Sequence, residues 1–189
     1  MDIQAGVHHR VTGLPATVDE AVVALGHPVA LPTGPLHGPP GIETRSSREV
    51  GEPGWADAIT LRFRGPLLCV VTQKRDRCAD SLAATAATTL GSCWQSGPVE
   101  AEDAEHLLWQ LIRTEQAASR RGRTQHTTVD GRAHTAIRVE YADLAAWALD
   151  LGELRISLSG PADTVDGRGV VLWLPQPPEG PPPRGQGNP

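Results

Sequence analysis

The sequence predicts an α+β domain: an antiparallel sheet of about five to seven strands, two consecutive helices packed on one face, and a C-terminal β-meander. Three observations lead to this prediction. Apolar residues keep a helical period over residues 76–90 and again over 99–121. From Gln125 onward the period changes to two, which is typical of half-buried strands. The pentapeptide Thr-Val-Asp-Gly-Arg occurs at both Thr128–Arg132 and Thr164–Arg168, and Asp-Gly is a strong hairpin signal.

The N-terminal part of the chain predicts one strand, one helix and one long loop. Residues 3–12 are expected to form the strand. Thr17 and Glu20 have the spacing of a capping box, and the apolar residues that follow fall on one helical face. Gly26 is expected to end this helix. Residues 27–54 are rich in glycine and proline, so we expect a long irregular loop there, a feature of functional or disordered segments.

Two strands and two helices are predicted in the middle of the chain. Residues 59–63 alternate between apolar and polar types, which indicates a half-buried strand. The unbroken apolar run over residues 67–71 indicates a central strand covered on both faces. The helix over 76–90 presents a face made mostly of alanine and is expected to end at Gly91. The helix over 99–121 begins with acidic residues and ends with arginines, which matches the helix dipole.

The C-terminal third predicts a series of strands joined by tight turns. Alternation is clear over residues 135–141 and 154–158, and residues 170–174 form a short apolar strand. Residues 143–152 fit either a strand or a helix. We prefer a strand, because Gly152 leaves only a tight turn before the next strand.

The histidines beside the first Asp-Gly turn form a polar pair of interest. If the hairpin is tight, His126 and His134 are expected to lie opposite each other across it. A metal site at this place would need a third ligand. We therefore interpret the pair as exposed hairpin histidines and predict no metal site.

The composition limits the classes of partner. The formal net charge is −5, whereas a nucleic-acid-binding domain needs a basic face. No apolar run is long enough for a transmembrane helix, and the N-terminus lacks the features of a signal peptide. Three cysteines without a Cys-x-x-Cys pair argue against a disulfide framework or a zinc site. These observations predict a cytoplasmic protein that binds no nucleic acid, membrane or cofactor.

The composition also suggests a source. Lys74 is the only lysine, and Met1, Phe63, Tyr141 and Asn188 are each the only residue of their type. All five residue types have AT-rich codons. We therefore infer a GC-rich bacterial genome.

Arginine-rich clusters border the two ends of the predicted helical pair. The first contains Arg75 and Arg77, and the second contains Arg120, Arg121 and Arg123. Guanidinium groups suit carboxylate or phosphate partners, so the clusters could form a shared site for an anion or an acidic partner. The local alternative is that they solubilise loops and, in the second cluster, complement a helix dipole.

Tryptophans supply most of the aromatic content. Trp147 and Trp173 occupy strand positions that suggest core packing. Trp55 and Trp94 fall in predicted loops beside glycine and proline, where an exposed indole is a plausible interface anchor. Trp55 and Trp94 are therefore candidate binding residues.

The sequence contains no recognisable catalytic constellation. We find no Gly-x-Ser-x-Gly elbow, Walker A motif or Gly-x-Gly-x-x-Gly fingerprint. We therefore expect a non-enzymatic protein-binding module, either a regulator or an immunity-type inhibitor, whose partner is another protein and whose oligomeric state is open. The alternative is an enzyme or small-ligand-binding protein with a site under the 27–54 loop. A pocket with converging polar groups would favour that alternative, and an exposed apolar patch with Trp55 or Trp94 would favour the binding module.

The boundary of the predicted domain leads to a testable prediction. Residues 176–189 contain almost nothing apolar, so we expect a disordered tail that lies outside a single domain of residues 1–175. Truncation after Pro175 should leave the melting temperature, measured by circular dichroism, unchanged. A drop of several degrees would show that the tail packs against the domain and that this boundary is wrong.

Overall fold

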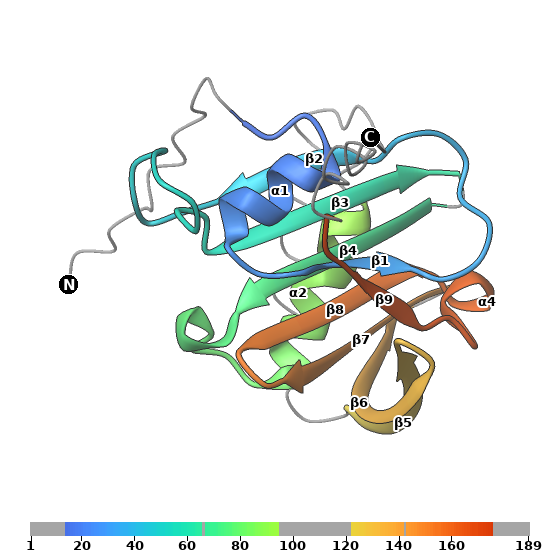
Figure 1. Ribbon diagram of the computed structural model, residues 1–189. Coiled ribbons are helices and arrows are strands. Elements are labelled where there is room, and N and C mark those ends of the chain that lie inside the picture. Colours follow the sequence, from blue (N-terminus) through green and yellow to red (C-terminus); the bar gives the residue numbers. More distant parts are fainter. Residues whose placement is uncertain (1–13, 66, 95–121, 142, 176–189) are drawn as a thin grey trace, which may run out of the picture.

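The protein is a mixed α+β structure built on one curled nine-stranded sheet (Figure 1). The computed structural model describes residues 14–65, 67–94, 122–141 and 143–175. The predicted strand over 3–12, the predicted helix over 99–121 and the predicted tail lie outside these residues. The elements are α1 (Val18–Leu25), β1 (Val29–Pro32), β2 (Gly41–Arg45), β3 (Ala58–Arg64), β4 (Leu67–Lys74), the 3-10 helix η1 (Arg75–Arg77), α2 (Leu82–Trp94), β5 (Arg123–Val129), β6 (Arg132–Tyr141), β7 (Leu144–Leu151), β8 (Leu154–Pro161), α4 (Ala162–Val165) and β9 (Val170–Trp173).

The strand order across the sheet is β1-β9-β5-β6-β7-β8-β4-β3-β2. Strands β5 to β8 form the predicted antiparallel meander, and the uncertain segment 143–152 is a strand. The last strand, β9, leaves the meander: it pairs with β1 and makes one parallel contact with β5. The sheet is therefore antiparallel apart from that contact.

The first Asp-Gly pair closes the tight hairpin that the sequence predicts. Asp130 and Gly131 have φ values of 49° and 73°, and Val129 pairs with Arg132 directly across the turn. In this register His126 pairs with Thr135, whereas His134 pairs with Thr127. Cross-strand partners share a face, so the two histidines lie on opposite faces of the hairpin. The prediction that they face each other was wrong by one residue of register.

The sheet curls so that one end, formed by β1 and β9, overlies its middle strands. Strands β1 and β9 cross in front of β4 and β8 (Figure 1), and the backbone N–H of Ala30 in β1 donates to the Thr72 hydroxyl in β4 at 2.9 Å. This curl encloses the main apolar core on the concave face. The largest fully buried side chains are Trp147, Leu25, Ile59, Leu61, Leu68, Leu149, Ile156, Leu158, Val29, Val70, Val165 and Val170.

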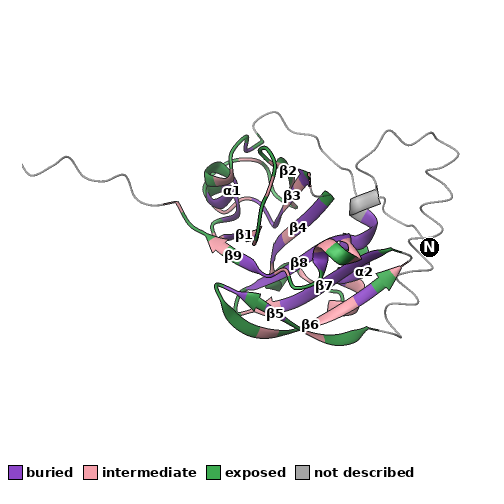
Figure 2. Cartoon of the chain, turned by 90° about the vertical axis from the view of Figure 1, so that its right-hand side faces the viewer, coloured by how far each residue is buried: buried purple, intermediate pink, exposed green. Residues whose placement is uncertain are grey.

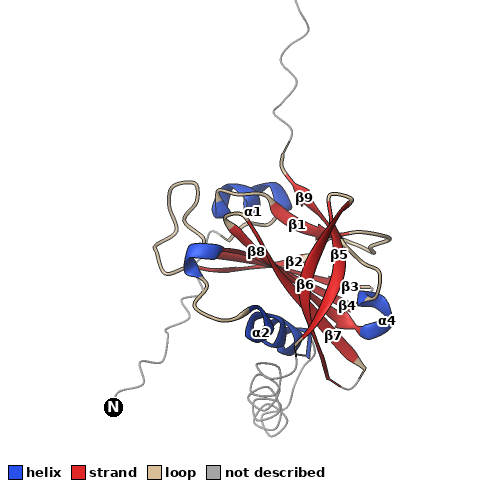
Figure 3. Ribbon diagram, turned by 90° about the horizontal axis from the view of Figure 1, so that it is seen from below, coloured by secondary structure: helices blue, strands red, loops and turns tan. Residues whose placement is uncertain are grey.

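Helix α2 covers the opposite, convex face of the sheet, and α1 lies on the other side (Figures 1 and 3). The alanine face predicted from the sequence packs over β6, β7 and β8: Ala86, Ala87 and Leu90 share one buried cluster with Val139 and Ala146. The central strands β3, β4, β7 and β8 are mostly buried, whereas the β5–β6 hairpin is largely exposed (Figure 2).

Arg155 joins α2 to the sheet through a buried ion pair. Arg155 is 7% exposed, and its guanidinium binds both carboxylate oxygens of Asp150, at 2.7 and 3.2 Å. It also donates to the Asp80 carbonyl and the Thr85 hydroxyl at the start of α2. The hydrogen bonds to Asp150 raise the pKa of Arg155 above its ordinary value despite burial. Asp150, Asp80 and Thr85 therefore supply the polar partners that a buried guanidinium requires.

Two predictions need correction: the loop over 27–54 and the bounds of the helix over 76–90. Residues 27–54 contain β1 and β2, so the long irregular loop was wrong. Both strands are short and flanked by proline, and the long-range pairing that defines them leaves little local signal. The helix expected over 76–90 runs from Leu82 to Trp94, because residues 75–77 form η1 and the Ser81 hydroxyl accepts from the Ala84 N–H. It therefore passes through Gly91 rather than ending there.

The strand count and one core assignment also differ from the expectation. The sheet has nine strands, whereas about five to seven were expected. The difference arises because β1 and β2 were not predicted. Trp147 is in the core as predicted, whereas Trp173 is 42% exposed on the short strand β9. No helix among the described residues combines the length and apolar character needed to cross a membrane.

Replacing Arg155 tests the contribution of the buried ion pair. The substitution Arg155→Met keeps most of the side-chain volume but removes the bidentate partner of Asp150, which retains only its contact with Arg75 among the described residues. We expect the free energy of unfolding, measured by urea denaturation, to fall by about 3 kcal/mol. Arg132→Met, at an exposed strand position, should change it by less than about 0.5 kcal/mol. Equal small effects would show that the pair does not stabilise the fold.

Candidate functional site

A groove beside helix α1 is the candidate functional site. It has a volume of about 510 Å³ and is lined mainly by apolar side chains. Leu14 and Val23 are 39% and 53% exposed, so the groove presents apolar surface to solvent. The lining residues are Leu14, Pro15, Asp19, Glu20, Val23, Ala24, Gly51, Pro53, Trp55 and Pro175.

Helix α1 forms one wall of the groove. The predicted capping box is present: the Thr17 hydroxyl accepts from the Glu20 N–H at 3.2 Å, and the Glu20 carboxylate accepts from the backbone N–H of Thr17. Gly26, with a φ of 71°, ends the helix as predicted. These caps fix both ends of a helix of only eight residues, which would be marginal in isolation.

The opposite wall is the loop of residues 46–55, which we call the groove loop. It is hydrogen-bonded to the last turn of α1: Gly54 N–H donates to the Val23 carbonyl at 2.9 Å, and Ala56 N–H donates to the Ala24 carbonyl at 2.8 Å. Gly26 and Gly54 touch closely, and a Cβ atom on Gly26 would lie 2.9 Å from the Gly54 Cα. Both glycines have positive φ. The two walls are therefore joined by backbone contacts that larger residues would obstruct.

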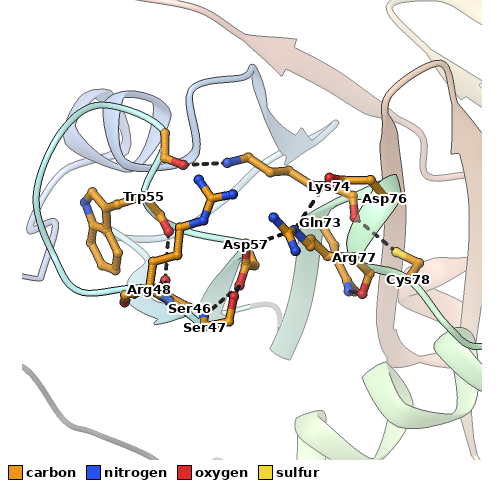
Figure 4. A network of polar contacts seen from close by, with 11 residues as sticks. Ser46, Ser47, Arg48, Trp55, Asp57, Gln73, Lys74, Asp76, Arg77 and Cys78 are labelled. Atoms are coloured by element: carbon orange, nitrogen blue, oxygen red, sulfur yellow. Dashed lines mark hydrogen bonds and ion pairs between the residues drawn. The ribbon is translucent and has the colours of Figure 1, made fainter.

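Polar side chains hold the groove loop in shape (Figure 4). The Ser46 hydroxyl donates to the Trp55 carbonyl at 2.7 Å and bridges to the backbone of Arg48. Asp57 accepts hydrogen bonds from both the N–H and the hydroxyl of Ser47, each at 2.7 Å. These hydrogen bonds join the start of the loop, at Ser46 and Ser47, to Trp55 at its end and to Asp57 just beyond it.

Basic side chains attach the same loop to β4 and η1. The Lys74 ammonium donates to the Gly54 carbonyl at 2.6 Å, and Arg77 lies 3.6 Å from the Asp57 carboxylate (Figure 4). Burial opposes ionisation of Asp57, but the hydrogen bonds from Ser47 and the nearby cations outweigh it. The pKa of Asp57 therefore lies below its ordinary value. Asp57 is a structural anion that orders the loop.

The last strand reaches the groove from a third direction. The indole N–H of Trp173 in β9 donates to the Asp19 carboxylate on α1 at 2.7 Å. Leu174, which follows, is 58% exposed, and Pro175 lines the groove. The exposed apolar surface therefore continues from the groove onto the end of β9.

The predicted binding residues lie in separate parts of the structure. Trp55 lines the groove and is half-buried. Trp94 is not in a loop, because it is the last residue of α2. Of the arginines, Arg75 pairs with Asp150 at 3.2 Å and Arg77 with Asp57. Arg123 on β5 pairs with Glu140 on β6.

The predicted shared anion site gains no support from these positions. The three described arginines each bind a carboxylate of the same chain, which favours the local explanation. Arg120 and Arg121 lie outside the described residues. The described parts of the chain contain no group of three or more His, Cys, Asp or Glu side chains placed to hold a metal ion.

The chemistry available in the groove is apolar contact combined with negative charge. Asp19 and Glu20 are the titratable side chains among its lining residues, and both accept hydrogen bonds within the fold.

Outside the groove, the Cys78 thiol donates to the Lys74 carbonyl, and burial raises the pKa of Cys78, which keeps the thiol protonated. A protonated thiol is a weak nucleophile.

Comparison with protein-family models, with curated proteins and with solved structures found no match to this chain.

Several residues that build the groove were not identified from the sequence. Ser46, Ser47 and Asp57 form hydrogen bonds with residues about ten positions away in the sequence. The segment between them has no regular period that would indicate these contacts. The Pro53-Gly54 pair does indicate a turn. Its contact with Gly26, however, depends on the packing of distant segments.

The ionisation of Asp57 leads to a prediction about acid stability. Because its folded-state pKa is depressed, its ionised form stabilises the fold above the unfolded-state pKa of about 3.9, and this contribution is lost as pH falls below that value. The urea midpoint of the wild type should therefore fall more steeply between about pH 5 and pH 3 than that of Asp57→Asn. Asp163→Asn, at an exposed position, serves as the control. Parallel pH profiles for the wild type and Asp57→Asn would contradict this assignment.

Proposed function

We propose that this protein is a non-enzymatic protein-binding module, acting as a regulator or an immunity-type inhibitor, and that the groove beside α1 receives the partner. The observation that supports the proposal most directly is the position of Trp55. Its side chain lines an apolar groove together with the exposed side chains of Leu14 and Val23. Tryptophan is enriched among the residues that dominate binding energy at protein interfaces.

The rigidity of the groove also supports this proposal. Backbone hydrogen bonds join the groove loop to α1, and Asp57 and Lys74 hold the loop from the other side. A surface that is ordered before binding loses less conformational entropy when a partner docks. The groove therefore needs little rearrangement to act as a recognition site.

A small-ligand site at the same place is the second candidate. The volume of about 510 Å³ lies within the range of small-molecule pockets, and residues of the 27–54 segment form one wall. The lining is apolar, and its two carboxylates accept hydrogen bonds within the fold, so the groove is suited to binding rather than to acid–base chemistry.

We propose a cytoplasmic location for either function, in line with the composition.

Variants at the groove test the proposed function. The wild-type chain and the variants Trp55→Ala, Val23→Gln and Leu67→Gln are immobilised and exposed to lysate of the native host. Val23 is exposed, so its replacement should leave the melting temperature unchanged, while Leu67 is a matched exposed apolar control on β4. A specific partner should be captured by the wild type and Leu67→Gln, and about tenfold less by the groove variants.

Two results would contradict the proposal. One is a stoichiometric partner that all four proteins capture equally, which would place the binding surface elsewhere. The other is a small molecule that co-purifies with the wild type, is lost from Val23→Gln and is accompanied by no protein partner. That second result would support the small-ligand alternative.

A further inference from the structure

We propose that the groove recognises a short segment of its partner in which an apolar side chain is flanked by lysine or arginine. This inference rests on the proposed function and adds the chemical class of the partner. It is drawn from the distribution of charge around the groove.

The charged residues that form the groove are acidic. Asp19 and Glu20 line it directly, and the groove loop adds the exposed residues Glu49 and Glu52. The segments 14–26 and 46–55 together contain four acidic residues and one basic residue, Arg48, which is not a lining residue.

The carboxylates that line the groove are not neutralised by the protein's own cations. Asp19 accepts from the neutral indole of Trp173, and Glu20 accepts from the backbone N–H groups of Ala16 and Thr17. Within the described residues neither forms an ion pair. Both residues lie in the first turn of α1.

Two basic side chains near the groove loop have partners within the fold, and neither lines the groove. The Lys74 ammonium binds the Gly54 carbonyl, and Arg77 binds the Asp57 carboxylate. The groove therefore presents an apolar floor with unpaired negative charge at its margin. A basic and apolar segment complements both features, while an acidic segment would be repelled.

Selection from a random peptide display library against the full chain tests this inference. Peptides whose binding requires Trp55 and Val23 should be enriched in an apolar residue next to lysine or arginine. A representative binder is then synthesised, together with a version in which glutamine replaces each basic residue. Binding is measured by fluorescence anisotropy at low and high salt.

The affinity of the basic peptide should weaken with added salt, and that of the glutamine version should already be weaker at low salt. The double substitution Glu49→Gln/Glu52→Gln and the single substitution Asp19→Asn should each weaken binding by about threefold to tenfold. The exposed control Asp163→Asn should leave it unchanged. Retention of full affinity after these acidic residues are removed would overturn the inference.

The failures of the two proposals are distinguishable. Peptides that need Trp55 and Val23 but are neutral or acidic would overturn the partner class and leave the groove as a binding site. Basic peptides that bind equally well to Trp55→Ala and Val23→Gln would overturn the inference, because their site is elsewhere. If no selected peptide depends on the groove, the proposed function fails as well.

Discussion

The nine-stranded sheet must cover its own concave apolar face, and this requirement governs the rest of the structure. The described helices are too few to do it: α2 is on the convex face, and α1 has only eight residues. The sheet instead folds over itself, so that β1 and β9 pack across β4 and β8. The hydrogen bond from Ala30 to Thr72 satisfies a backbone donor where the β1 end of the sheet overlies β4.

The groove is a consequence of this overlap. Helix α1 leads directly into β1, so the position of the overlapping strands also sets the position of the helix. Trp173 on β9 then reaches Asp19, and the groove loop is held between α1 and the start of β3. Three described segments converge there, and Leu14, Val23 and Leu174 are exposed on them. The same convergence places acidic side chains at the margin of that surface.

The sequence predicts elements whose signals are local and misses those defined by distant contacts. The capped helix at Thr17, the Asp130-Gly131 hairpin and the strands from β5 to β8 follow from turn chemistry and period. Strands β1 and β2 do not, because proline and glycine dominate their surroundings and only their pairing makes them strands. The site follows the same rule. Trp55 could be identified as a candidate anchor, but the contact of Gly26 with Gly54 and the role of Asp57 depend on tertiary packing.

The topology of β9 determines when the groove can form. Strand β1 has its ladder partner in β9, so the N-terminal helix and strand cannot complete their pairing until nearly all of the described chain has been synthesised. Contacts between such distant segments form late and slow the folding of a domain. The surface proposed for recognition is built from Leu14 at one end of the described chain and Pro175 at the other, so it needs both to be in place. A partner that requires this groove would bind only chains that have finished folding.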